Sequence, residues 1–258
     1  MKKIAALLFL TFFFQEILFA GEIIQIEPGI SLYASKFENP DHKIRPVILL
    51  LPEWWGMTSQ MMVLADDFAE SGFAAYALDL YGGRVAQNPY EASELMRSLP
   101  EAEALEKIRK ALDFLQKKAP YLPKEVPLGH AVEPGLDGNR IGVIGWSMGG
   151  GLALKIAAMD DRVKAVAVYY GKFSEDDSEL SKLKAPILGI FAGKDPVISR
   201  SEIENFKHRL DLLGKRSELL IYENAEHSFM DWHIEAYQSE DVKDSWDKTV
   251  LFFRSNLG

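Results

Sequence analysis

Short, continuously apolar segments alternate with amphipathic segments along most of this chain of 258 residues. Segments such as 47–51 and 141–144 have no polar face, which is typical of strands buried on both sides of a sheet. Between such segments, apolar residues recur at helical spacing, as in Leu105, Ile108 and Leu112. The alternation predicts an α/β fold in which a mainly parallel central sheet has helices on both faces.

The positions of the elements follow from the same pattern. We expect strands at residues 22–27, 31–37, 47–51, 73–78, 140–145, 163–169, 187–191 and 218–222. Helices are expected at 59–71 and, packed on the sheet, at the C-terminus from Val242 to Phe253. Another helix is expected after a capping box of Ser98 and Glu101. Residues 119–139, rich in proline and glycine, predict one long irregular connection.

Bulk composition limits the classes of function. The chain is long enough for one sizeable hydrophobic core, so we expect a single domain over residues 21–258. The formal net charge of −9 argues against nucleic acid as a partner, because binding phosphates requires clustered Lys and Arg. The lack of cysteine excludes disulfides and thiolate zinc sites. We expect a small molecule as the partner and a monomer as the oligomeric state.

Residues 1–20 resemble a secretory signal peptide. Lys2 and Lys3 precede an apolar run at 4–14, and Ala20 with Gly21 offers a small-residue cleavage point. The run is too short for a membrane span. We therefore expect a periplasmic or secreted protein with no stable membrane insertion after cleavage. The alternative is an uncleaved N-terminal anchor.

Residues 145–149 read Gly-Trp-Ser-Met-Gly, follow an apolar strand and precede a helix-forming stretch. This pattern between strand and helix is typical of a sharp turn that exposes a nucleophilic serine, here Ser147. The Met148 N–H, at the start of the helix, is then a candidate donor to an oxyanion. The alternative is a glycine-rich turn whose serine has no catalytic role.

An acid and a base follow in the order Ser, Asp, His, which is that of the α/β-hydrolases. Asp195 lies at the edge of one predicted strand, and His227 follows the last one. A carboxylate beside an imidazole fixes its tautomer and stabilises the imidazolium, so the pair could serve Ser147 as a base. His233 is the rival base. Asp195 could instead cap a helix that begins near Ser199.

Glu53 follows the buried segment 47–51 and precedes two tryptophans, Trp54 and Trp55. A carboxylate at this strand end faces the same sheet edge as Ser147. The Trp54 N–H is a second candidate donor to the oxyanion. The alternative for Glu53 is a solvated loop residue beside tryptophans that belong to the core.

The chain resembles the dienelactone hydrolase family over roughly residues 46–253. The resemblance is carried by Leu-Pro-Glu-Trp-Trp-Gly at 51–56, Asp-Leu-Tyr at 79–81 followed by Arg84, Gly-Trp-Ser-Met-Gly-Gly at 145–150, Tyr-Tyr-Gly at 169–171, Asp195, and His-Ser-Phe at 227–229. It implies an α/β-hydrolase fold, a catalytic triad of Ser147, Asp195 and His227, and Glu53 beside the nucleophile. It also implies an oxyanion site at the Met148 and Trp54 N–H groups, and no metal or organic cofactor.

Two features depart from the family pattern. The best-known members carry cysteine where this chain has Ser147, and a serine needs base assistance throughout the reaction, which leaves the role of Glu53 open. Those members also hold the carboxylate of the lactone with two arginines. Arg84 matches the first, but the segment after His227 reads Ser-Phe-Met-Asp and has no arginine for the second. We therefore expect a substrate other than dienelactone itself.

Together these features predict an exported serine hydrolase of carboxylic esters or lactones, with an acyl-enzyme on Ser147. The residues expected to bind substrate are Arg84, Tyr81, Trp55, Trp146 and Phe229, with Trp54 and Trp232 as further candidates for the pocket wall; ordinary core packing is the alternative for each aromatic residue. A thioesterase, an acetyl-esterase or a peptidase could use the same triad. Outside the enzymes, the alternative is an inactive hydrolase-like binding protein.

Overall fold

The computed structural model describes residues 21–36, 43–118, 135–233, 237 and 239–258. The predicted signal peptide, residues 1–20, lies outside the described residues. So does most of the predicted irregular connection, residues 119–134. Seven of the eight predicted strands lie wholly within the described ranges, and the eighth, 31–37, lies there up to residue 36; a strand is found at each of the eight positions.

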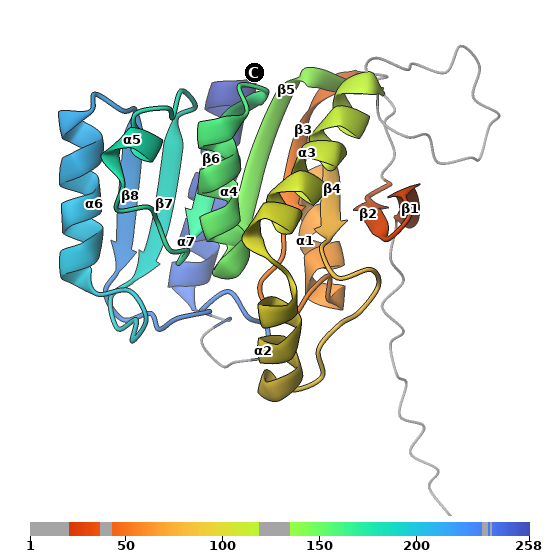
Figure 1. The fold of residues 1–258 in the computed structure, drawn as a ribbon. Coiled ribbons are helices and arrows are strands. Elements are labelled where there is room, and N and C mark those ends of the chain that lie inside the picture. The colour runs from red at the N-terminus through yellow and green to blue at the C-terminus, as the bar shows by residue number, and fades with distance from the viewer. Residues whose placement is uncertain (1–20, 37–42, 119–134, 234–236, 238) are drawn as a thin grey trace, which may run out of the picture.

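One eight-stranded sheet forms the centre of the described part of the molecule, in the order β1-β2-β4-β3-β5-β6-β7-β8 (Figure 1). The hairpin of β1 and β2 joins it antiparallel, and every other neighbouring pair from β4 to β8 is parallel. The strands are β1 (Glu22–Glu27), β2 (Ile30–Ala34), β3 (Ile44–Leu51), β4 (Ala74–Asp79), β5 (Gly135–Trp146), β6 (Val163–Tyr169), β7 (Ile187–Ala192) and β8 (Ser217–Tyr222). The mainly parallel sheet predicted from the apolar segments is confirmed.

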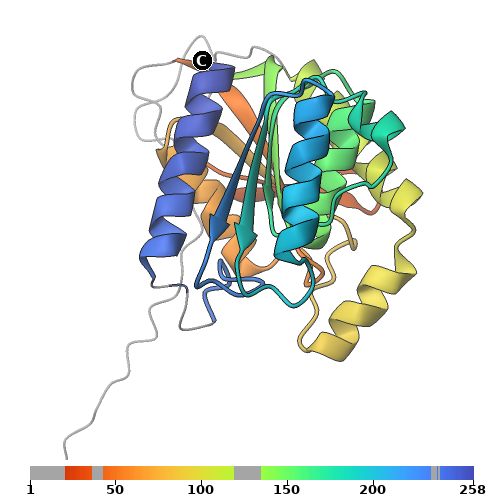
Figure 2. The same ribbon diagram turned by 90° about the vertical axis from the view of Figure 1, so that its left-hand side faces the viewer.

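Helices cover both faces of the sheet. They are α1 (Ser59–Glu70), α2 (Pro89–Ser98), α3 (Glu101–Lys117), α4 (Met148–Met159), α5 (Asp177–Leu180), α6 (Arg200–Leu212) and α7 (Glu240–Leu257). Figure 2 shows α7, in dark blue, on one side of the sheet and α6, in lighter blue, on the other. None of the helices in the described ranges has the length and apolar character needed to cross a membrane.

Two apolar cores result, one on each face of the sheet. Successive residues of β3 alternate between them, with Leu49 and Leu51 facing the core that α3 and α4 complete, and Ile48 and Leu50 facing the core of α1 and α7. Because successive side chains of a strand point to opposite faces, a strand between two helical layers must be apolar at every position. This explains the continuous apolar segments in the sequence.

Two local predictions are wrong. Ser98 does not open α3 with a capping box, because it is the last residue of α2 and its hydroxyl donates to the Leu95 carbonyl at 2.8 Å. Pro100 occupies the N-cap of α3 and provides no side-chain cap. A capping box does occur at the start of α6, where Ser199 and Glu202 exchange hydrogen bonds. A serine followed three residues later by glutamate therefore forms a capping box at Ser199 but not at Ser98.

The predicted irregular connection also ends earlier than expected. Residues 135–139 belong to β5, and Gly135 pairs with Ile44 of β3. Glycine and proline content predicted a loop here, but the ladder to β3 supplies backbone hydrogen bonds that outweigh the low strand propensity of glycine.

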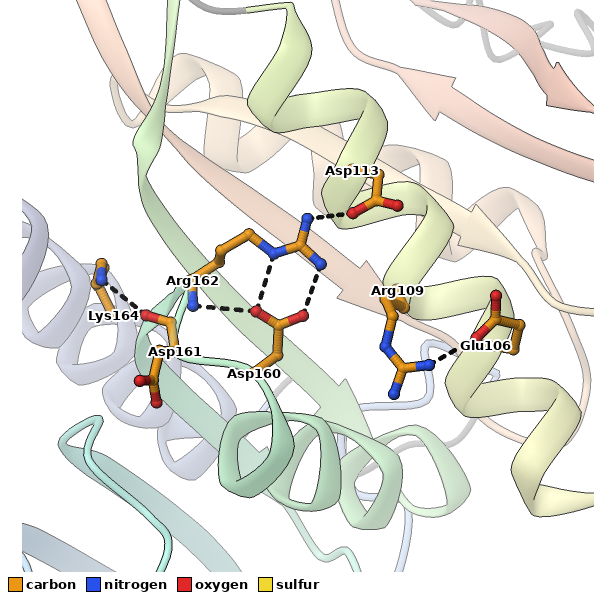
Figure 3. A network of polar contacts seen from close by, with 7 residues as sticks. All are labelled: Glu106, Arg109, Asp113, Asp160, Asp161, Arg162 and Lys164. Carbon is orange, nitrogen blue, oxygen red and sulfur yellow. Dashed lines mark hydrogen bonds and ion pairs between the residues drawn. The ribbon is translucent and has the colours of Figure 1, made fainter.

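A network of ion pairs fixes the end of α4 away from its serine turn (Figure 3). Arg162, in the turn between α4 and β6, donates to both oxygens of Asp160 at 2.9 and 2.6 Å and reaches Asp113 of α3. The Arg162 N–H also donates to Asp160. The side chains of Asp160 and Arg162 are only 11% and 19% exposed, so water screens their pairing weakly. The hydrogen bonds from Arg162 lower the pKa of Asp160.

Asp160→Asn should lower the free energy of unfolding by about 2 kcal/mol at neutral pH, because it removes a charge-assisted pairing and leaves Arg162 under-paired. A lowered pKa stabilises the folded state above the unfolded pKa, and that contribution is lost as the pH falls through the folded value. Denaturant titration at pH 7 and at pH 3 should therefore show the difference from wild type shrinking in acid. Asp161→Asn is the control, since that side chain is 70% exposed; a control effect as large as that of Asp160→Asn would contradict this account.

Candidate active site

The parallel strands of the sheet deliver the predicted site residues to one edge. In Figure 1 the arrowheads of β7 and β8 point to the lower edge, and β3 and β5 end at the same edge because they are parallel to them. Glu53 follows β3, Ser147 follows β5, Asp195 follows β7 and His227 follows β8. Ligands of open parallel sheets bind outside the carboxyl ends of the strands, so this edge is where a site is expected.

Ser147 occupies a strained turn between β5 and α4. Its φ of 48° is left-handed, which is rare for a residue with a side chain, and its N–H donates to the Tyr169 carbonyl at 2.9 Å. Glycine is required on both sides of the turn. A Cβ on Gly145 would lie 2.1 Å from the Gly149 carbonyl oxygen, and one on Gly149 would lie 2.3 Å from the Leu51 carbonyl oxygen. The turn therefore holds the serine side chain above the end of the sheet, as the sequence predicted.

Three side chains that are distant in sequence form one hydrogen-bonded chain. The distance from Ser147 Oγ to His227 Nε2 is 3.0 Å, and that from His227 Nδ1 to Asp195 Oδ2 is 2.7 Å. A carboxylate only accepts hydrogen bonds, so Nδ1 carries the proton and Nε2 is left to accept from the serine hydroxyl. The Asp195 side chain is 1% exposed, which keeps water from competing for its oxygen. This is the geometry in which an imidazole can act as a base toward a hydroxyl.

The alternatives considered for these residues do not match the geometry. The N-cap of α6 is Ser199, not Asp195. The other oxygen of Asp195 accepts from the Val197 and Ile198 N–H groups at 2.7 and 3.2 Å, which orients the carboxylate toward His227. His233 is 75% exposed and its Nδ1 contacts Asp231, so it makes no contact with Ser147.

The Met148 and Trp54 N–H groups, predicted as donors to an oxyanion, belong to two segments that meet at the carboxyl edge of the sheet. Met148 is the first residue of α4, and the first N–H groups of a helix have no acceptor within it. The Trp54 N–H lies just beyond β3, whose end packs on the first turn of α4. Among the described residues, no backbone carbonyl accepts from the Trp54 N–H. Both groups are thus free to donate to a ligand.

Glu53 belongs to a second hydrogen-bonded cluster, beside the serine and not bonded to it. Tyr170 Oη donates to Glu53 Oε1 at 2.9 Å, and Ser228 Oγ donates to Glu53 Oε2 at 3.4 Å. Tyr170 and Ser228 have φ values of 36° and 61°, and with Ser147 they are the non-glycine residues of the described chain that have positive φ. Glu53 is therefore held in place by strained neighbours, and the alternative of a solvated loop residue does not fit its hydrogen bonds.

Burial raises the pKa of Glu53 to about 6, although the hydrogen bond from Tyr170 and the nearby His227 act in the opposite direction. Asp231 also raises it through charge repulsion. Burial likewise raises the pKa of Tyr170 well above its ordinary value, so that this residue remains a phenol and donates. Sequence analysis did not identify Tyr170 or Ser228 as partners of Glu53, although both lie in the segments 169–171 and 227–229 next to predicted strand ends.

A hollow of about 500 Å³ opens beside this cluster. Glu53, Trp55, Trp146 and Tyr170 line it, together with Gly56, Thr58, Ser59, Gln60, Met61, Leu64, Val85, Ala86, Gln87, Met230, Asp231, Trp232 and His233. Ser147 and His227 do not line it themselves. They adjoin it through Trp146, the neighbour of Ser147 in sequence, and through Tyr170, whose ring centroid lies 5.1 Å from that of His227.

The predicted substrate-binding residues divide into two groups. Trp55 and Trp146 line the hollow, as Trp232 does. Tyr81 and Phe229 do not; both are buried, Tyr81 with its hydroxyl 3.5 Å from the Met148 sulfur and Phe229 against Tyr170. Arg84 is exposed and lines a separate hollow with Glu91 and Glu94.

Comparisons with known proteins identify the family and the fold of this chain. The model of the dienelactone hydrolase family matches residues 33–257. Protein usf of Aquifex pyrophilus is 29% identical over 220 residues, covering 82% of this chain and 89% of that protein. A protein of Aquifex aeolicus with the name "Putative carboxymethylenebutenolidase" is 27% identical, with the same coverage of both chains. The crystal structure of a dienelactone hydrolase-like promiscuous phosphotriesterase from metagenomic libraries superposes with a TM-score of 0.75 at 19% identity, covering 92% of this chain and 98% of that one. The α/β-hydrolase fold is thereby confirmed.

Metal binding has no support from the described side chains. In those ranges, no group of three or more His, Cys, Asp or Glu residues is arranged to hold an ion.

Glu53→Gln should stabilise the protein at pH 8 and leave it unchanged at pH 4. The folded state binds the Glu53 proton more tightly than the unfolded chain does, so stability falls as the pH rises from about 4.5 to about 6. This rise in pKa corresponds to a loss of about 2 kcal/mol in the free energy of unfolding when Glu53 ionises. Glutamine has nearly the same shape and does not ionise, so the variant avoids that loss. Urea titration of both proteins at the two pH values measures this. Equal differences at pH 4 and pH 8, or a loss of stability confined to pH 8, would contradict the burial of a charge at this position.

Proposed function

This chain belongs to the dienelactone hydrolase family, and from that premise we propose that it cleaves carboxylic esters or lactones with Ser147 as nucleophile. Family membership establishes a hydrolase of the dienelactone hydrolase type. The assignment of the nucleophile is supported by one observation above all, the continuous contact from Ser147 through His227 to Asp195. Residues brought together from three different strand ends have no evident structural reason to meet in this order.

In the proposed first step, Ser147 Oγ attacks the carbonyl carbon of the substrate while its proton passes to His227 Nε2. The carbonyl oxygen becomes an oxyanion, to which the Met148 and Trp54 N–H groups donate. Asp195 keeps the proton on Nδ1 and stabilises the imidazolium that forms. The intermediate then collapses and expels the alcohol oxygen, which takes the proton from Nε2. An acyl-enzyme on Ser147 remains.

Water completes the reaction. His227 Nε2, neutral again, accepts a proton from a water molecule as its oxygen attacks the acyl carbon. A second oxyanion forms in the same place, and its collapse breaks the bond to Ser147 Oγ, which recovers its proton from Nε2. The carboxylic acid leaves and then loses its remaining proton to the solvent. The steps need neither an oxidant nor a metal ion, since proton transfer and attack by oxygen balance the hydrolysis.

A serine imposes a stricter requirement on the base than a cysteine would. The serine hydroxyl is not ionised at neutral pH, so attack requires the proton to leave during the step. The 3.0 Å contact with Nε2 supports such a transfer.

Ser147→Ala should reduce kcat for 4-nitrophenyl acetate by about 10⁴-fold while leaving the fold intact. It should also abolish covalent labelling by a fluorophosphonate, which reacts with an activated serine. Absorbance of the released 4-nitrophenol measures kcat, and intact-protein mass spectrometry measures the labelling. Circular dichroism checks the folding. Ser181→Ala is the control, because that serine is exposed on the surface beside α5. Turnover or labelling that survives in Ser147→Ala would overturn the assignment, and a wild-type protein that does neither would favour an inactive binding protein.

A further inference from the structure

Three segments that follow different strands build the hollow beside Ser147 together with Trp146 and Tyr170. Trp55 and Gln60 come from the segment after β3, Val85 to Gln87 from the segment after β4, and Met230 to His233 from the segment after β8. Gln60 joins the first to the last, with its Nε2 donating to the Met230 carbonyl and its Oε1 accepting from the Trp232 N–H. The hollow is therefore a formed enclosure at the edge where the reaction is proposed to occur.

The charges around the hollow are negative. Two carboxylates line it, Glu53 and Asp231, and they lie close enough for Asp231 to raise the pKa of Glu53. Among the described residues that line it there is no lysine and no arginine. Its one other ionisable wall residue besides Tyr170 is His233, which is exposed at the rim and whose Nδ1 contacts Asp231. Arg84, the cation that the sequence offered for an anionic substrate, lies in a different hollow among glutamates.

Four aromatic side chains belong to the wall, and two of them, Trp55 and Trp232, are only half-buried. Trp55, Trp146, Trp232 and Tyr170 all line the hollow. The face of an aromatic ring carries partial negative charge and attracts a cation, and tryptophan does so most strongly. Carboxylates combined with tryptophan and tyrosine rings are the surroundings that suit a quaternary ammonium group, which is bulky, apolar on its outside and permanently charged.

We propose that this hollow receives the part of the ester remote from the reacting carbonyl, and that it selects a quaternary ammonium group over an uncharged group of the same shape and rejects a carboxylate. The proposal deepens the hydrolase function above and rests on it. A carboxylate in the hollow would lose its hydration and face Glu53 and Asp231 with no cation to compensate. A trimethylammonium group would face both negative charges and the rings.

Three 4-nitrophenyl esters with acyl chains of equal length test the selection. The chains end in trimethylammonium, tert-butyl or carboxylate, and each enzymatic kcat/KM is divided by the rate constant for hydrolysis by hydroxide, which removes the intrinsic reactivity. Measurements at pH 8 keep Glu53 ionised, because its pKa is about 6. We expect the trimethylammonium ester to exceed the tert-butyl ester about tenfold and the carboxylate ester to fall about tenfold or more below it.

Variants identify the source of the selection. Asp231→Asn should reduce the ratio of trimethylammonium to tert-butyl ester severalfold, because it removes one of the two negative charges in the wall. Asp161→Asn makes the same change in charge at the opposite end of the sheet, before β6, and should leave the ratio as in wild type. Equal kcat/KM for the three esters, or a preference for the carboxylate, would overturn the proposal and leave the hydrolase function standing.

A binding measurement decides the matter even if no ester is cleaved. In the Ser147→Ala protein, quenching of tryptophan fluorescence reports on Trp55, Trp146 and Trp232 in the hollow. Choline and 3,3-dimethylbutan-1-ol have the same shape and differ in charge. Choline should bind about tenfold more tightly, and Asp231→Asn introduced into the same protein should reduce that difference. Equal affinities would refute the proposal, whereas tighter choline binding without hydrolysis would keep the selective hollow and refute the hydrolase function alone.

Discussion

The close approach of α4 to the end of β3 is the contact on which the whole site depends. The backbone of Gly149 passes so near the Leu51 and Pro52 carbonyls that it leaves no room for a side chain. This contact fixes the turn that raises Ser147. It also brings Glu53 and Trp54, the two residues after Pro52, close to Ser147. The two candidate oxyanion donors belong to segments far apart in sequence, and this one contact between backbones sets their separation.

Strain in the backbone is concentrated at the same place. Ser147, Tyr170 and Ser228 each have positive φ, at a cost of the order of 1–3 kcal/mol for each residue. Hydrogen bonds to the rigid sheet hold the first two, since Ser147 donates to the Tyr169 carbonyl and Tyr170 donates to the Ile190 carbonyl at 2.7 Å. The side chain of Ser147 belongs to the series of hydrogen bonds that ends at Asp195. The side chains of Tyr170 and Ser228 hold Glu53. Strain at strand ends thus positions side chains that unstrained backbone would direct elsewhere.

Sequence periodicity predicted the inner strands well because nearly all of their residues are buried, which leaves an almost continuous apolar signal. The predicted bounds of β6, 163–169, match the structure to the residue. Motif spacing likewise predicted that Ser147, Asp195 and His227 would follow three strands. Patterns of a few residues failed where tertiary contacts decide which element a residue belongs to. Ser98 is an example, because it is the last residue of α2 and no local pattern predicts that a helix ends there. The partners of Glu53 were out of reach for a related reason. Their side chains meet Glu53 only because β3, β6 and β8 end at one edge of the sheet. In addition, nothing in the sequence indicates that a tyrosine such as Tyr170 has a positive φ.

A serine nucleophile changes what the neighbouring carboxylate can do. A thiol can be held inactive by a carboxylate because its proton is acidic enough to move between them, but a serine proton is not. In this chain Ser147 contacts His227, and both oxygens of Glu53 are occupied by Tyr170 and Ser228. The negative charge of Glu53 therefore acts at a distance in two directions. It interacts with His227, which lowers the pKa of Glu53, and it repels anions from the hollow, so that in the proposed reaction one buried charge lies beside both the base and the substrate.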